Sequence, residues 1–164
     1  MFEKVLNYVL SSPKTEKQVR DYLFRKKVGA TEADEIVGKL MGYGYVNDAE
    51  YAKQFVAQQI GRQGKAVIGL KLMQKGVARK IVDVAFFELE SGDGYSDGVD
   101  LTQEQMCAAK RVAEKWMRGK VATREVRGKL YGYLMGKGFN SELAGRVSRE
   151  AKGEEGEETD ENWD

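Results

Sequence analysis

The stretch from Gly42 to Val77, GYGYVNDAEYAKQFVAQQIGRQGKAVIGLKLMQKGV, predicts a tight turn, a capped helix, a glycine-rich basic joint, a second helix and a Lys-Gly stop. Its second half recurs later in the chain, where Ile68, Leu72, Lys75 and Gly76 correspond to Leu130, Leu134, Lys137 and Gly138. A looser copy lies earlier, at Val19, Leu23 and Lys26, with no glycine directly after. Recurrence of one helical pattern indicates an array of similar helical units.

Cap residues and apolar spacing extend this pattern over the whole chain. Apolar residues three and four positions apart indicate helices with one buried face. Residues of the type that caps helix N-termini precede six of these runs, at Thr15, Thr31, Asn47, Thr102, Thr123 and Asn140. The sequence therefore predicts an all-α protein of nine short helices, arranged as three tandem three-helix repeats that share apolar surface.

Turns and composition divide the chain into five segments. We predict helical repeat one at 1–46, helical repeat two at 47–90, a polar glycine-rich linker at 91–101, helical repeat three at 102–152 and a disordered acidic tail at 153–164. The tail holds seven acidic residues and no basic one, so the remaining residues carry 27 basic against 19 acidic side chains. Such segregation suits a protein that meets polyanions, although a tail that only keeps the chain soluble fits the same composition.

Several classes of function lack the residues that they need. The chain has no histidine and a single cysteine, Cys107, so the common nucleophile pairs and zinc sites are absent. We expect no enzyme activity and no cofactor. Asp93, Asp97, Gly98 and Glu104 match part of a calcium loop, but Tyr95 stands where a ligand is needed, which favours a solvated linker. We expect a cytoplasmic protein, because the sequence has neither a signal-peptide pattern nor a run of about 18 apolar residues.

Basic side chains are the candidate binding residues. From Gly61 to Lys80 there are six basic residues and no acidic one. In the third repeat, basic residues follow one helical stripe and continue into the next helix. The predicted binding residues are Arg62, Lys65, Lys71, Lys75, Arg79, Lys80, Arg111, Lys115, Arg118, Arg124, Arg127 and Lys129. Contacts to phosphates, or to an acidic protein surface, are favoured over ordinary solvated faces because the stretch is free of acids.

The central stretch resembles a known family. Its Gly44-Tyr45-Val46-Asn47-Asp48 turn, Tyr51-Ala52 and Phe55-Val56 pairs, Gly64-Lys65 joint and Lys75-Gly76-Val77 stop are similar to the central signature of RecX, the bacterial regulator of the RecA recombinase. Leu130–Phe139 resembles the signature of the third RecX repeat. The sequence departs from the family pattern in two places. The first repeat lacks the Lys-Gly stop, and in the central stretch Lys65 stands near the place of the usual proline.

The resemblance implies a curved, elongated array of three repeats in the groove of the RecA filament on single-stranded DNA. There it would restrain filament growth, strand exchange and co-protease activity in DNA repair and the SOS response. The implied partners are RecA, its nucleofilament and single-stranded DNA, with double-stranded DNA as a weaker partner. We expect no membrane contact and a monomeric protein. Two alternatives stay open: a helical-repeat DNA-binding module that acts without RecA, and a helical adaptor for another acidic protein.

Overall fold

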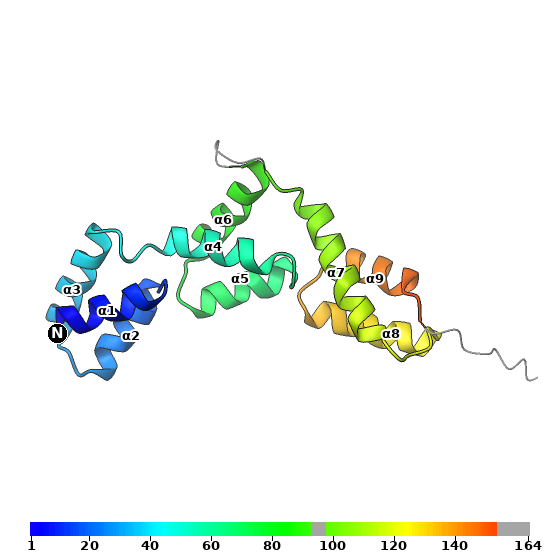
Figure 1. Cartoon of the computed structure of the whole chain (residues 1–164), viewed down its shortest axis with the longest axis horizontal. Coiled ribbons are helices and arrows are strands. Elements are labelled where there is room, and N and C mark those ends of the chain that lie inside the picture. Colours follow the sequence, from blue (N-terminus) through cyan, green and yellow to red (C-terminus); the bar gives the residue numbers. More distant parts are fainter. Residues whose placement is uncertain (93–97, 154–164) are drawn as a thin grey trace, which may run out of the picture. The chain divides into compact units, whose positions relative to one another are not determined.

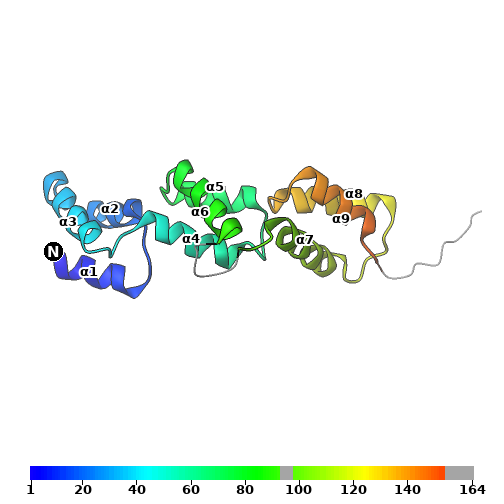
Figure 2. The ribbon, with the colours of Figure 1, turned by 90° about the horizontal axis from the view of Figure 1, so that it is seen from above.

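The computed structural model describes residues 1–92 and 98–153, and these residues form helices without a β-strand. The helices are α1 (Phe2–Ser11), α2 (Glu16–Arg25), α3 (Ala30–Gly42), α4 (Asp48–Gln59), α5 (Lys65–Gln74), α6 (Arg79–Ser91), α7 (Leu101–Met117), α8 (Arg124–Gly136) and α9 (Ser141–Glu150). They follow one another as three groups of three (Figures 1 and 2), which confirms the predicted all-α repeats. Residues 154–164 of the predicted tail and 93–97 of the predicted linker, with Asp93 and Asp97 of the partial calcium loop, lie outside the described residues.

Four of the six predicted helix caps are confirmed. Thr15 and Gln18 form a reciprocal capping box on α2, and the side chains of Asn47, Thr123 and Asn140 accept backbone N–H groups at the next helix starts. The cap predicted at Thr31 is wrong, because α3 begins at Ala30 and Gly29 precedes it without a side-chain cap. Thr102 is wrong too, since α7 already begins at Leu101 and the Gln105 side chain binds elsewhere.

The second helix of each group ends in the same way. After α5 and α8 the chain turns through Gly76 and Gly138 with φ of 91° and 87°, the left-handed conformation that ends many helices. The N–H group after each glycine donates to a carbonyl one turn back, Val77 to Leu72 at 3.1 Å and Phe139 to Leu134 at 3.3 Å. The first group closes identically, because Val28 N–H donates to Leu23 O at 3.2 Å and Lys27 adopts a φ of 58°. The stop is therefore present in all three groups, with lysine in place of glycine in the first.

Replacing Lys27 with glycine is expected to stabilise the first group. A side chain in the left-handed region strains the backbone, and glycine removes this strain at some cost in unfolded-state entropy, which leaves a net gain of about 0.5–1 kcal/mol. Urea unfolding measures the change. Lys26→Gly is the matched control, because Lys26 has a φ of −85° and gains nothing from glycine. A Lys27→Gly chain no more stable than the Lys26→Gly chain would contradict the assignment.

The chain folds as two compact units, which we call the N-terminal unit (Met1–Gln59 and Ile68–Asp100) and the C-terminal unit (Ile60–Val67 and Leu101–Asp164). In the N-terminal unit, α1–α3 enclose a core of Val5, Val9, Val19, Leu23, Ile36, Val37, Leu40 and Val46. Leu10 and Met41 are 60% and 48% exposed because each lies one position beyond the core stripe of its helix. None of the described helices is long and apolar enough to cross a lipid bilayer.

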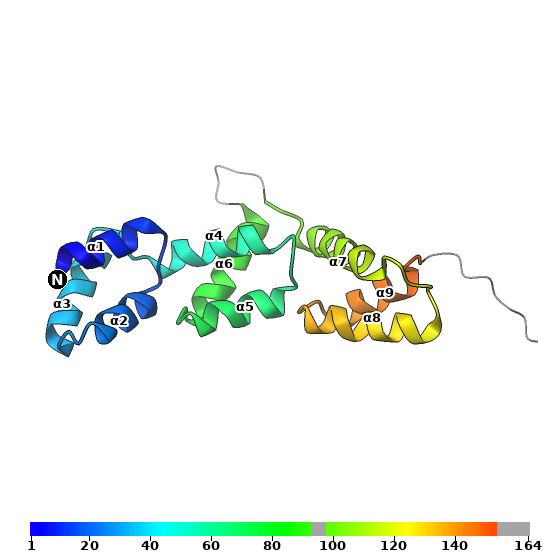
Figure 3. The same cartoon turned by 60° about the horizontal axis from the view of Figure 1, so that its bottom comes forward.

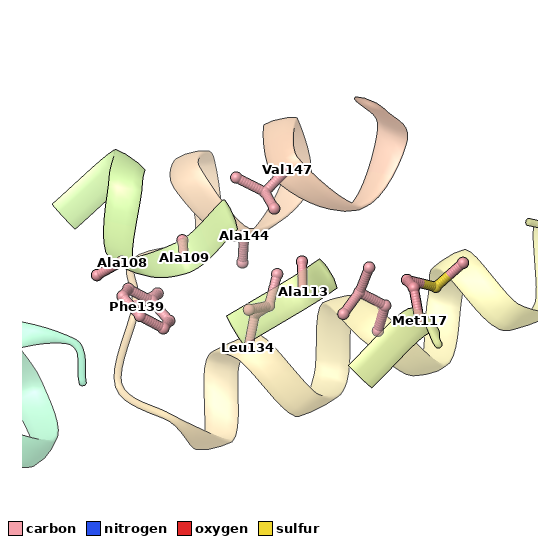
Figure 4. Packing of buried hydrophobic residues seen from close by; sticks show 9 residues of the cluster. Ala108, Ala109, Ala113, Met117, Leu134, Phe139, Ala144 and Val147 are labelled. Carbon is pink, nitrogen blue, oxygen red and sulfur yellow. The ribbon is translucent and has the colours of Figure 1, made fainter. Parts of the chain in front are cut away.

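The core of the C-terminal unit is built on small residues of α7. Ala108, Ala109 and Ala113 are almost fully buried, and they let the other helices of the group come close. Side chains from α8, from α9 and from the turn between them fill the space opposite (Figure 4), and Figure 3 shows α7, α8 and α9 side by side. These partners are Leu130, Leu134, Phe139, Ala144 and Val147. Burial of this apolar surface fixes the face that α7 and α8 leave for solvent.

A repeated contact joins the start of one second helix to the stop of another. In the N-terminal unit, the Thr15 hydroxyl before α2 donates to Lys75 O at the end of α5, at 2.6 Å. In the C-terminal unit, Gly64 N–H before α5 donates to Lys137 O at the end of α8, at 2.9 Å. A Cβ on Gly64 would overlap the carbonyl group of Gly138, so this close approach requires glycine. The starts of α2 and α5 are thus each covered by a carbonyl oxygen from the end of another helix.

Gln105 of α7 holds the joint between α4 and α5. Its side-chain amide donates to Ile60 O at 2.8 Å and to Gln63 O at 3.0 Å, and its carbonyl oxygen accepts the Lys65 N–H at 3.1 Å. Lys65 is the first residue of α5, whose N–H has no partner inside its own helix. A side chain 40 positions away in the sequence therefore caps α5 and holds the backbone of the joint that carries Arg62 and Lys65.

Candidate nucleic-acid and protein interface

The predicted binding residues are distributed over both compact units. Lys71, Lys75, Arg79 and Lys80 belong to the N-terminal unit, and the other eight belong to the C-terminal unit. In the N-terminal unit Lys71 and Lys75 are half-buried, whereas Arg79 and Lys80 are exposed. Lys75 lies 6.0 Å from the rings of Tyr51 and Phe55, a distance at which a cation is attracted by an aromatic face. Half of this predicted set is thus engaged in packing.

Folding brings the basic joint onto the third group of helices. Arg62 and Lys65 belong to the same compact unit as α7 and α8, and both side chains are exposed. The Arg111 guanidinium lies beside Gly61, where an added Cβ would be 3.3 Å away. The sequence pattern alone assigned the joint to the second repeat, so this association is a finding of the structure. It rests on the hydrogen bonds of Gln105 described above.

Two of the predicted residues in the C-terminal unit are paired with carboxylates. Arg111 lies 3.0 Å from Glu104, and Lys129 lies 2.6 Å from Glu125 one turn away on α8. The Lys129 ammonium donates a hydrogen bond to Glu125 and thereby lowers the pKa of that carboxyl below its usual value. Such exposed pairs contribute little to stability and exchange readily with other partners. Lys115, Arg118, Arg124 and Arg127 extend the set as exposed side chains.

Lys120 and Lys137, which were not among the predicted binding residues, add two cations to those of the C-terminal unit. The Lys120 ammonium lies 4.2 Å from the centre of the Trp116 ring, and the Lys137 ammonium lies 5.2 Å from that of Tyr133. The two rings approach one another at 5.9 Å between centroids, so the four side chains form a continuous row. Each lysine follows its aromatic residue by four positions and lies just beyond the end of its helix, Lys120 after α7 and Lys137 after α8. That spacing was the available signal.

A cavity of about 540 Å³ lies next to the joint in the C-terminal unit. Its lining includes the apolar residues Leu101, Met106 and Phe139 and the charged residues Lys65, Glu142 and Arg146. Arg146, on α9, is exposed and was not among the predicted residues. A lining that combines apolar side chains with more basic than acidic ones suits a partner that carries both negative charge and apolar side chains.

The row of rings and cations can bind by two kinds of contact. Tyr131 and Tyr133 are 39% and 38% exposed, so part of each ring can accept a stacked base, while the cations beside them can meet phosphates. Among the described residues no three His, Cys, Asp or Glu side chains are grouped so that they could hold a metal ion. The arrangement therefore supports binding of a polyanion.

Comparison with known proteins gives one consistent family. Models of the first, second and third three-helix domains of RecX match residues 2–40, 47–85 and 103–147. Curated relatives named regulatory protein RecX include those of Clostridium beijerinckii, 29% identical over 145 residues, and Listeria monocytogenes serovar 1/2a, 32% identical over 156 residues. These matches cover 88% and 92% of this chain but 65% and 54% of the relatives, so the chain spans little more than half the length of the second.

Two solved structures share the fold. A crystal structure of RecX from Lactobacillus salivarius superimposes with a TM-score of 0.70 at 24% identity, over 91% of this chain and 92% of that one. A second crystal structure, of a regulatory protein RecX, gives a TM-score of 0.72 at 22% identity, over 90% of this chain and 70% of that one. At such identities the likeness concerns the arrangement of the helices.

Proposed function

Because the chain belongs to the RecX family of regulatory proteins, we propose that it binds the RecA protein and the RecA filament on single-stranded DNA. There it inhibits or modulates the recombinase, ATPase and co-protease activities of the filament in DNA repair and the SOS response. The protein itself performs no chemical step in this proposal. It acts by occupying a surface that the filament needs for growth and strand exchange.

One observation about the site carries this proposal furthest. The C-terminal unit collects the basic joint, the exposed cations of α7 and α8, and the row formed by Lys120, Trp116, Tyr133 and Lys137. Cations beside partly exposed rings are the combination that single-stranded nucleic acids select, because phosphates and base faces are bound together. A RecA filament presents an acidic DNA backbone within a protein surface, which matches these two kinds of contact.

Titration of the protein into RecA tests the proposal. With single-stranded DNA saturated by RecA, the rate of ATP hydrolysis is expected to fall as the protein approaches one molecule per several RecA subunits. A DNA-stimulated ATPase unrelated to RecA is the control for simple removal of DNA, and its rate should stay unchanged at the same protein concentration. No change in RecA hydrolysis at stoichiometric protein would refute the proposal.

The exposed cation surface also favours a second candidate, a DNA-binding module that acts without RecA. In that case both ATPases would slow in parallel, because the protein would withdraw DNA from each. Bare single-stranded DNA would bind as tightly as RecA-coated DNA, with a steep dependence on salt. Preference for the coated strand by fluorescence anisotropy supports the first proposal over the second.

A further inference from the structure

We propose that the acidic stretch 154–164 is an intramolecular ligand of the basic surface at the turn between α7 and α8. We call this the turn surface, and it consists of Arg118, Lys120, Arg124 and Arg127. The contact itself is independent of the proposed function. Its consequence, competition with a polyanionic partner for the same cations, rests on that function.

The turn surface is basic and accessible. From Lys115 to Arg124 the chain has four basic residues and no acidic one. Arg118, Arg124 and Arg127 are exposed, and Lys120 is half-buried over the Trp116 ring, where its ammonium also donates to the Trp116 carbonyl. The nearest carboxylate along α8, Glu125, is held by Lys129 at 2.6 Å. An anion at this surface therefore meets several positive charges, and the nearest negative charge along α8 is already paired with Lys129.

The chain itself delivers acidic residues to this surface. A Cβ built on Gly153 would lie 2.5 Å from Lys120 O and 2.6 Å from Ala122 N, so Gly153 is seated directly on the turn. The next eleven residues contain seven acids and no base. Eleven residues reach about 35 Å when extended, whereas a helix of the length of α8 is about 20 Å long. The acids can thus reach every cation of the turn surface without movement of the helices.

The repeat contact gives an independent reason for an electronegative partner at this place. The starts of α2 and α5 are covered by carbonyl oxygens, those of Lys75 and of Lys137. The start of α8 is the third equivalent end, and Gly153 lies against the turn before it. In this proposal, tail carboxylates place negatively charged oxygens near the start of α8, as helix ends place carbonyl oxygens near the starts of α2 and α5. Negative charge is favoured near a helix N-terminus.

Tethering makes even a weak contact effective. Attachment through a short segment of chain holds two groups together at an effective concentration on the order of millimolar, so individually weak ion pairs can occupy the turn surface for most of the time. If the tail occupies the surface for about four-fifths to nine-tenths of the time, a competing polyanion binds about five- to tenfold more weakly. Salt screens exposed charges, so the effect is expected to be largest at low ionic strength.

Zero-length carbodiimide cross-linking of the full chain tests the contact without any partner. The tail carboxylates are expected to couple to Lys115, Lys120 and Lys129, as mapped by mass spectrometry, and the yield should fall at high salt. Coupling spread evenly over lysines of both compact units, or directed mainly to Lys71 and Lys80, would overturn the proposal. The readout does not depend on RecA or DNA, so it stands apart from the test of the proposed function.

Competition is measured with a neutral-tail variant of the full chain. In it every tail acid becomes its amide, by Glu154→Gln, Glu155→Gln, Glu157→Gln, Glu158→Gln, Asp160→Asn, Glu161→Gln and Asp164→Asn. At low salt this variant is expected to bind a fluorescent single-stranded oligonucleotide five- to tenfold more tightly than the unchanged chain. Equal affinity of the two chains would overturn the competition.

A mutant cycle locates the competition on the turn surface. With Arg124→Ala and Arg127→Ala present, tail neutralisation is expected to change oligonucleotide affinity less than twofold. With Lys4→Ala and Lys39→Ala, two exposed basic residues of the first group, the five- to tenfold effect should persist. The same tail effect in both backgrounds would place the tail elsewhere and overturn the assignment. If no variant binds the oligonucleotide, the DNA part of the proposed function fails, and the cross-linking result still decides the contact.

Discussion

Replacing Gln105 with leucine is expected to lower the free energy of unfolding of the C-terminal unit by about 2–3 kcal/mol. Gln105 is only 8% exposed and makes three hydrogen bonds to the joint, to Ile60 O, Gln63 O and Lys65 N. Leucine fills a similar volume but leaves these backbone groups without their partner, and each buried unsatisfied group costs about 1–3 kcal/mol. Water can reach part of the joint, which keeps the expected sum at the lower end.

Trp116 fluorescence during urea unfolding reports this change, measured in a Trp163→Phe background so that one tryptophan remains. Gln103→Leu is the matched control, the same chemical change on an exposed position of α7. Gln105→Glu separates the two roles of the amide, because a carboxylate still accepts the Lys65 N–H but donates nothing to Ile60 and Gln63. Equal stability of the Gln105→Leu and Gln103→Leu chains would show that the joint is held by other contacts.

The fold was predictable because its signals are local. Apolar spacing, caps such as Thr15 and Asn140, and the Lys-Gly stops are each set by residues within one turn of a helix end. Two caps were mispredicted because threonine can also lie just inside a helix, where Thr31 and Thr102 are found. The stop at Lys27 was missed for a related reason, since the pattern of hydrogen bonds there imposes a left-handed residue that the sequence does not mark with glycine.

The candidate site was predictable only as a list of charges. Exposure of Arg118, Arg124 and Arg127 could be expected because charged side chains are rarely buried without a partner, and all three are exposed. The association of Arg62 and Lys65 with α7 depends on a hydrogen bond over 40 positions, from Lys65 N–H to Gln105, and no local pattern announces such a contact. Gly64 carried a weak hint, because a glycine inside a basic joint suggests close approach of another backbone.

Removal of three cations from the turn surface is expected to produce the largest functional change. The variant is Arg118→Ala, Arg124→Ala and Arg127→Ala, placed in the neutral-tail chain so that competition by the tail does not mask the loss. Each phosphate contact to a single strand releases counterions and contributes about 0.7 to the slope of log affinity against log salt. At about 0.1 M salt, loss of three such contacts weakens binding roughly 100-fold.

Fluorescence anisotropy with a single-stranded oligonucleotide over a series of salt concentrations measures both quantities. The slope is expected to fall by about 2 together with the loss of affinity. The matched control removes three exposed cations of the first group, by Lys4→Ala, Arg25→Ala and Lys39→Ala, and should leave affinity and slope close to those of the parent. Circular dichroism of both variants checks that the helices are retained.

Slope and RecA response together identify what the surface touches. If the slope falls and modulation of RecA hydrolysis is lost, the three arginines contact phosphates of DNA within the filament. If modulation is lost while the slope for bare DNA stays unchanged, they contact an acidic surface of RecA, because only phosphate contacts release the condensed counterions of DNA. An unchanged slope with unchanged modulation would contradict the assignment of this surface. The binding residues would then have to be sought in the N-terminal unit, at Arg79 and Lys80.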